Sequence, residues 1–146
     1  MKVTLIHNPD SGIGRRVTAG ELLRAIGNAG CTARYQSTKD PDWHRALDAA
    51  TDIIAVAGGD GIVGRVAQRC AGRRTPIAVL PLGTANNIAR CLGLTDVPLE
   101  SLVEQWHTAP RQRIDLACAT GPWGSLPFIE GMGVGLFTEV MSQLDA

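Results

Sequence analysis

The residues most suited to chemistry form one short stretch, Gly58-Gly59-Asp60-Gly61, which follows directly on an apolar run at residues 53–57. That run is mostly β-branched, which is typical of a strand buried on both faces. Glycines directly after such a strand indicate a tight turn or a close approach of the backbone to a ligand. Main-chain N–H groups in such a turn can bind phosphate, and a following helix adds the positive end of its dipole. The stretch therefore predicts a phosphate-binding turn.

Asp60 adds a carboxylate to this turn. A carboxylate beside phosphate is repulsive unless a divalent cation lies between them or a donor hydroxyl has to lose its proton. Asp60 is therefore a candidate catalytic residue in metal-assisted phosphoryl transfer. The simpler interpretation is a strand-to-helix turn in which Asp60 caps the helix. These four residues alone support both interpretations equally.

Alternating strands and helices are expected to position this turn. The expected strands are residues 2–7, 31–36, 53–57 and 77–80, and the expected helices are residues 15–29, 42–50, 62–71, a stretch that Gly93 ends, and 98–107. This alternation predicts an α/β fold, a three-layer αβα Rossmann-like parallel sheet with right-handed crossovers. Ligands of such sheets bind outside the carboxyl ends of the strands.

Polar, glycine-bearing loops follow the carboxyl ends of the expected strands. These are residues 8–14, 58–61 and 83–87, with residues 37–40 as a possible fourth. After residue 110 the pattern changes, because residues 113–119 and 126–131 predict an antiparallel hairpin, and residues 137–144 a closing helix. We expect the three or four loops to converge on one ligand.

Composition excludes several classes of protein. The chain has 146 residues with 14 basic and 14 acidic side chains, which argues against a nucleic-acid surface held by phosphate contacts. Its four cysteines lack metal or disulfide spacing and indicate reduced core thiols in a cytoplasmic protein. No run of about 18 apolar residues predicts a membrane span. The three histidines show no metal-ligand spacing, and we assign none of them a metal.

Four motifs, in order, resemble those of the diacylglycerol kinase-like lipid kinases, which share a fold with NAD kinases. Asn8-Pro9-Asp10-Ser11-Gly12 is similar to the family's nucleotide loop, and Gly58-Gly59-Asp60-Gly61 to its glycine-rich turn. Pro81-Leu82-Gly83-Thr84-Ala85-Asn86-Asn87 is similar to its third loop, and Ile114-Asp115-Leu116 to a short strand with an aspartate. Residues 128–135 resemble the segment that opens the family's second domain. Such motifs at strand ends are a specific combination.

The resemblance implies a role for each matching residue. It implies ATP as the nucleotide and Mg²⁺ as the metal, with Asp60 near the reacting phosphate and Asp115 in the water network around Mg²⁺. The implied nucleotide-binding residues are Asn8, Ser11, Gly12, Thr38, Gly58, Gly59, Asp60, Gly61, Thr84 and Asn86.

The chain departs from the family's pattern at three places. Ile62 stands where the family normally has threonine, Gly64-Arg65 replaces an Asn-Glu pair, and Asn87 stands where aspartate is common. These departures support the alternative of a non-catalytic nucleotide-binding or regulatory module. An NAD kinase-like phosphotransferase is a further alternative, but the loop at residues 81–87 is more similar to the lipid kinases.

The resemblance implies a nucleotide-binding domain in residues 1–110 and the start of a truncated, β-rich second domain in residues 111–146. In the family, that second domain supplies the lipid-facing cleft and a base. We therefore expect a parent enzyme that transfers the γ-phosphate of ATP to a lipid hydroxyl such as that of diacylglycerol, with peripheral membrane contact. The isolated chain is expected to be inactive. Unpaired hairpin edges at residues 114–135 predict a homodimer.

Overall fold

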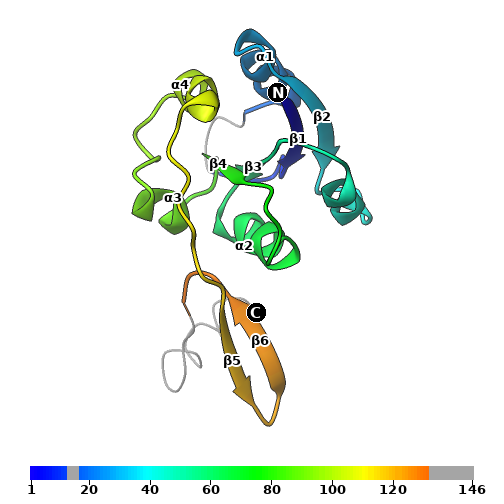
Figure 1. The fold of residues 1–146 in the computed structure, drawn as a ribbon, viewed down its shortest axis with the longest axis vertical. Helices are drawn as coiled ribbons and strands as arrows, with labels where there is room; N and C mark the ends of the chain where they lie inside the picture. The colour runs from blue at the N-terminus through cyan, green and yellow to red at the C-terminus, as the bar shows by residue number, and fades with distance from the viewer. Residues whose placement is uncertain (13–16, 132–146) are drawn as a thin grey trace.

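A four-stranded parallel sheet forms the centre of the molecule in the computed structural model, which describes residues 1–12 and 17–131. The strands lie in the order β2-β1-β3-β4 (Figure 1). Their bounds are Lys2–His7 for β1, Thr32–Ser37 for β2, Ile53–Gly58 for β3 and Ile77–Pro81 for β4. Each strand was predicted within one or two residues. The parallel α/β sheet is confirmed.

Strand β3 is buried at each of its six positions, as its apolar, β-branched sequence predicts. Its side chains alternate between two apolar clusters, because successive residues of a strand face opposite sides of the sheet. Ile53, Ala55 and Ala57 belong to one cluster. Ile54 and Val56 belong to the other. Two cores on opposite faces of one sheet define the three-layer αβα architecture.

Helices α1 (Ala19–Asn28) and α4 (Leu99–Glu104) cover one face of the sheet (Figure 1). Their buried side chains include Leu22, Ile26 and Val103. Helix α1 begins later than predicted, because Thr18 and Glu21 form a capping box in which each side chain accepts the other's main-chain N–H. The start predicted at residue 15 lies outside the described residues. A 3₁₀ turn, η2 (Gln105–His107), follows α4.

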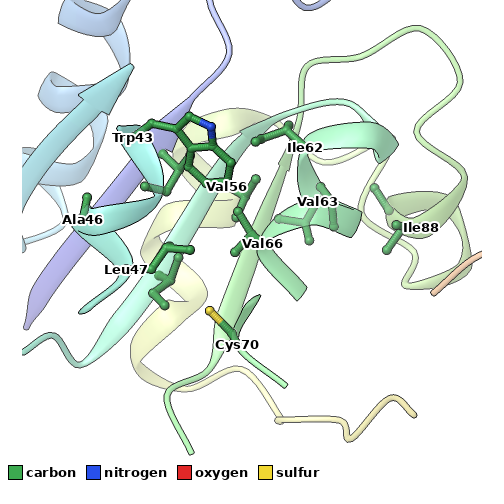
Figure 2. Close-up of a cluster of buried hydrophobic side chains, with 13 residues drawn as sticks. Trp43, Ala46, Leu47, Val56, Ile62, Val63, Val66, Cys70 and Ile88 are labelled. Carbon is green, nitrogen blue, oxygen red and sulfur yellow. The ribbon is translucent and has the colours of Figure 1, made fainter. Parts of the chain in front are cut away.

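The opposite face carries η1 (Trp43–Asp48), α2 (Asp60–Arg69) and α3 (Asn87–Cys91). Figure 2 shows Trp43 from η1 against Val56 and Ile62, next to Val66 of α2. The predicted α-helix at residues 42–50 is a 3₁₀ helix instead, so that prediction was wrong in type. Helix α2 begins two residues earlier than predicted, and this places Asp60 in its first turn.

Strands β5 (Ala117–Gly121) and β6 (Gly124–Phe128) form an antiparallel hairpin that extends from the α/β part (Figure 1). The hairpin is confirmed, but β5 starts four residues later than predicted. Residues 113–116 pair with no strand in the described part of the chain. The side-chain amide of Gln68 in α2 donates to the carbonyl of Pro127 at 2.9 Å, and Ile129 packs on the core beneath α2.

All four cysteines are free, as the sequence predicts. Cys31 and Cys70 are buried, whereas Cys91 and Cys118 are exposed, so only two of the four are core thiols. Burial raises the pKa of the Cys70 thiol, an effect that nearby Asp48 adds to and Arg73 opposes. None of the helices in the described ranges has the length and apolar character that a bilayer crossing requires.

Candidate functional site

The loops predicted to bind a ligand all leave the same edge of the sheet. In the strand register, His7 lies opposite both Ser37 and Ala57, and Gly58 lies opposite Pro81. These residues end, or nearly end, the four parallel strands. The loops that follow them therefore start side by side at the carboxyl edge, which is where open α/β sheets bind ligands.

Main-chain hydrogen bonds join each loop to its neighbour as it leaves the sheet. The N–H of Asn8 donates to the carbonyl of Ala57 at 2.9 Å, and the N–H of Leu82 donates to that of Gly58 at 3.1 Å. The N–H of Thr38 donates to the carbonyl of His7 at 2.9 Å. An ion pair of 3.1 Å between Lys39 and Asp10 also links the loops after β1 and β2. Hydrogen bonds and an ion pair thus connect the four loops along the carboxyl edge of the sheet.

The loop after β1 packs directly on the glycine-rich turn. A Cβ added to Gly58 would meet Ser11 Oγ at 3.2 Å and Asn8 Cβ at 3.4 Å. A Cβ on Gly12 would come within 2.6 Å of the carbonyl oxygen of Leu82, and its φ of +89° is itself unfavourable for other residues. Gly12 therefore lets the first loop touch the third.

Gly59 and Gly83 make the closest approach between the second and third loops. A Cβ on Gly83 would overlap the α-carbon of Gly59, and one on Gly59 would meet the α-carbon of Gly83 at 3.1 Å. Gly61 differs, since a Cβ there meets no atom of the described chain within 4 Å. Gly59 and Gly83 thus serve packing between loops, whereas no described residue crowds Gly61.

Asp60 ties these two loops together through its carboxylate. Oδ2 accepts the main-chain N–H of Asn87 and Oδ1 accepts that of Ile88, both at 2.9 Å. These donors are the first N–H groups of helix α3, which would otherwise lack a partner within the helix. Asp60 therefore caps a helix, as the simpler interpretation predicts, but the helix is α3 rather than its own.

Asn86 shapes the third loop. It is the only described non-glycine residue with positive φ, at 49°, and its side chain accepts from the N–H of Gly83 at 2.9 Å and donates to the carbonyl of Gly83 at 2.7 Å. Asparagine tolerates this left-handed conformation better than most residues. Thr84, which lies between Gly83 and Asn86 in the sequence, is exposed, so its hydroxyl is at the surface of the loop.

Asn87 contacts three parts of the chain, and its side-chain bonds were not predicted. Its side-chain amide donates to the carboxylate of Glu130, just after β6, and its oxygen accepts from Arg90 at 3.1 Å. Arg90 also donates to the carbonyl of Ala85 at 3.0 Å. Sequence reasoning missed Glu130 because it is 43 residues away from Asn87 and lies outside the four motifs at the nucleotide site.

Asp115 is exposed. It lines a cavity of about 1130 Å³ beside α2, β4 and α3, together with Cys70, Arg113 and Ile114. None of the predicted nucleotide-binding residues lines that cavity. Among residues 1–12 and 17–131, no three His, Cys, Asp or Glu side chains form a cluster that could hold a metal.

His7 lies buried beneath the first loop, with its side chain 2% exposed. Its Nδ1 is 3.2 Å from the hydroxyl of Tyr35, and the two rings meet edge to face. Burial lowers the pKa of His7, because an apolar environment disfavours the charged imidazolium. A neutral imidazole therefore supports the loop.

The departures at residues 62 to 65 serve packing. Ile62 is buried, and its Cγ2 fills the space that a Cβ on Gly58 would need. A Cβ on Gly64 would meet Ile129 at 3.6 Å, so this face of α2 receives the segment after the hairpin. The Arg65 guanidinium lies over the Trp43 ring, 5.9 Å from its centroid.

Comparison with known proteins places this geometry in a family. A sequence model described as the diacylglycerol kinase catalytic domain matches residues 2–119. The diacylglycerol kinase of Bacillus subtilis is 32% identical over 151 aligned positions, which cover 95% of this chain and 47% of that protein. The diacylglycerol kinase of Mycobacterium tuberculosis H37Rv is 32% identical over 105 positions, covering 64% of this chain and 32% of that protein.

A solved structure agrees with these relatives. The crystal structure of a diacylglycerol kinase from Bacillus anthracis matches with a TM-score of 0.55 and 27% identity, covering 70% of this chain and 40% of that one. The chain thus spans about half, or less, of the length of the relatives that it matches. The match over residues 2–119 shows that the chain belongs to the diacylglycerol kinase catalytic-domain family.

Proposed function

We propose that this chain is the ATP-binding part of a lipid kinase that transfers the γ-phosphate of ATP to a hydroxyl of a diacylglycerol-like lipid. The observation that carries the proposal is the meeting of three glycine-bearing loops at the carboxyl edge of one parallel sheet. Catalysis of phosphoryl transfer consists mainly of positioning and electrostatic stabilisation of the phosphates. Loops held this closely suit that task.

Each loop has a distinct part in binding the triphosphate. Asn8, Ser11 and Gly12 approach the phosphates from the first loop, and Thr38 offers a hydroxyl from the second strand's loop. Gly58, Gly59, Asp60 and Gly61 surround the phosphates, and Thr84 and Asn86 contact the nucleotide from the third loop. None of the described residues crowds a Cβ position at Gly61, which supports this arrangement because a phosphate can approach the backbone there.

Mg²⁺ would enter with the nucleotide. It usually retains several waters and binds through substrate phosphates and one or two carboxylates. This mode of binding needs no cluster of three protein ligands, and the described residues contain none. Asp60 lies close enough to the loops to serve near the reacting phosphate, whereas Asp115 would act through water.

The lipid acceptor requires more than this chain. We propose that residues 1–110 form the nucleotide-binding domain and that residues 111–146 begin a β-rich second domain with the lipid cleft. The parent enzyme would be cytoplasmic and would reach its lipid by peripheral membrane contact. The isolated chain would bind nucleotide without turnover.

The exposed hairpin supports a homodimer of the isolated chain. In the hairpin, Trp123 and Leu126 are 61% and 56% exposed, and Ile114, just before it, is 49% exposed. A two-stranded hairpin is marginally stable alone. Size-exclusion chromatography with light scattering should find a dimer at high micromolar concentration. A monomer at that concentration would exclude this interface.

Calorimetric titration of the chain with Mg·ATP tests nucleotide binding, and a radiolabelled ATP assay with diacylglycerol vesicles tests turnover. Binding without turnover is the expected pair of results. In a parallel assay with NAD in place of the vesicles, transfer of the label to NAD would indicate an NAD kinase-like phosphotransferase. Absence of any nucleotide binding would contradict the proposal.

A non-catalytic regulatory module is the second candidate. Its support is that both carboxylate oxygens of Asp60 already accept main-chain N–H groups, which leaves Asp60 less suited to act as a base. Turnover by the parent protein that survives Asp60→Asn would favour a structural role for Asp60. Absence of turnover by the parent protein itself would favour the module.

A further inference from the structure

Glu130 reaches the candidate nucleotide site from outside its motifs. Its carboxylate accepts a hydrogen bond from the side-chain amide of Asn87, the first residue of α3. Glu130 follows strand β6 by two residues, so this bond connects the base of the hairpin with the loop at residues 83–87. Both side chains are at least partly exposed, and the bond lies at the surface.

The third loop needs such an anchor, because its own helix is short. Helix α3 has five residues, and isolated helices of that length are not stable in water. Asp60 holds its first N–H groups from one side. Arg90 holds the Asn87 side-chain oxygen and the carbonyl of Ala85 from within the loop. Glu130 supplies the contact from the hairpin.

The polarity of this bond makes asparagine the residue that fits at position 87. A carboxylate oxygen accepts hydrogen bonds and cannot donate them at neutral pH, so its partner must carry a donor, which the side-chain NH₂ of asparagine supplies and an aspartate does not. Aspartate at position 87 would face Glu130 with a second negative charge, and like charges in contact repel each other. The departure at position 87 is therefore matched to Glu130.

We propose that Glu130 is a positioning residue of the nucleotide site, and that its bond to Asn87 fixes the loop at residues 83–87 in its binding shape. The proposal rests on the proposed function for its consequence, which is nucleotide affinity. Its structural half, the anchoring of the loop by Glu130, can be measured without nucleotide.

Four variants test the polarity of the bond. Glu130→Ala removes the acceptor, Glu130→Gln keeps an acceptor oxygen, Asn87→Asp creates repulsion, and Asn87→Asp with Glu130→Gln reverses donor and acceptor. Glu100→Gln, at an exposed position in α4, is the matched control. Reinstating the family's common aspartate at position 87 should therefore harm the site, and the second substitution should rescue it.

The first readout is amide hydrogen exchange of residues 83–91 without nucleotide. Exchange should be about threefold to tenfold faster in Glu130→Ala and in Asn87→Asp, since each loses a charge-assisted bond. In Glu130→Gln and in the double variant, the amide exchange rates should stay within about twofold of those in the unmutated chain. Unchanged exchange in Asn87→Asp, or no rescue in the double variant, would overturn the anchoring role.

The second readout is the Kd for Mg·ATP, which should rise in the same variants and recover in the double variant. If the unmutated chain binds no nucleotide but the variants show the expected amide exchange rates, the proposed function is wrong and the anchoring of the loop by Glu130 is still supported. If the parent chain binds nucleotide and the four variants bind equally well, the proposal about Glu130 fails alone.

Discussion

The backbones of Gly59 and Gly83 touch where the second and third loops meet, so that a Cβ on Gly83 would overlap the α-carbon of Gly59. Both neighbouring atoms belong to main chain, and main chain cannot move aside as a flexible side chain can. The shape of the proposed nucleotide site therefore depends on two residues that carry no functional group.

Gly83→Ala should destabilise the fold by about 1–3 kcal/mol, the usual cost of overpacking. Thermal or urea unfolding measures this difference. Gly27→Ala is the matched control, because Gly27 lies in α1 with open space around its α-carbon. That control should stabilise the chain by roughly 0.5–1 kcal/mol through helix propensity. Equal stability of the two variants would contradict the close approach of the loops.

Gly61→Ala separates packing from ligand binding. No atom of the described chain lies within 4 Å of a Cβ at this position, and Gly61 is the second residue of α2. The free energy of unfolding of the variant should equal that of the unmutated chain or exceed it by up to about 1 kcal/mol, because alanine favours a helix more than glycine does. Its Kd for Mg·ATP should rise about tenfold or more, because the methyl group occupies the approach of the phosphate. Unchanged affinity would argue against a phosphate at this turn.

Asp60→Asn tests the cap on α3. Asparagine presents an NH₂ group to one of the two main-chain N–H donors, those of Asn87 and Ile88, and so leaves one of them without an acceptor. The variant should lose about 1–3 kcal/mol of stability. Asp96→Asn, at an exposed position, should change stability by less than about 0.5 kcal/mol. Chemical denaturation gives both values, and a stable Asp60→Asn variant would show that the cap is dispensable.

His7 predicts how stability depends on pH. Burial lowers its pKa in the folded state below the ordinary value of 6.5. In the window between the two pKa values the unfolded chain binds more protons, so stability is full above pH 6.5 and falls as the pH drops toward the folded pKa. Melting temperatures measured from pH 7.5 to 5 should decline less in His7→Gln than in the parent chain. His44→Gln, which changes a less buried ring, is the matched control.

The sheet was predictable because burial on both faces leaves a simple signal. Strand β3 is apolar throughout, and the glycine-rich turn after it marks where the chain leaves the sheet. The ends of the helices were harder to predict. Helix α1 begins after Thr18 because Thr18 and Glu21 form a capping box. The segment η1 is a 3₁₀ helix rather than an α-helix. Such details depend on local geometry that periodicity does not carry.

The site was predictable as a group of loops but not as a network of contacts. The positions of Asn8, Gly58 and Gly83 follow from strand ends in a parallel sheet. The bond between Asn87 and Glu130 does not, because it depends on where the hairpin docks on α2. Asp115 lines a separate cavity, which strand ends do not predict either.

Chemical-shift mapping by NMR during a titration with Mg·ATP tests most directly whether phosphates bind at this edge of the sheet. Amide shifts should concentrate in residues 8–12, 37–40, 58–61 and 82–87, and Gly61→Ala should need more nucleotide to reach the same shifts, whereas Gly27→Ala should not. Shifts confined to the cavity lined by Asp115, or no shifts at millimolar nucleotide, would contradict phosphate binding at this edge.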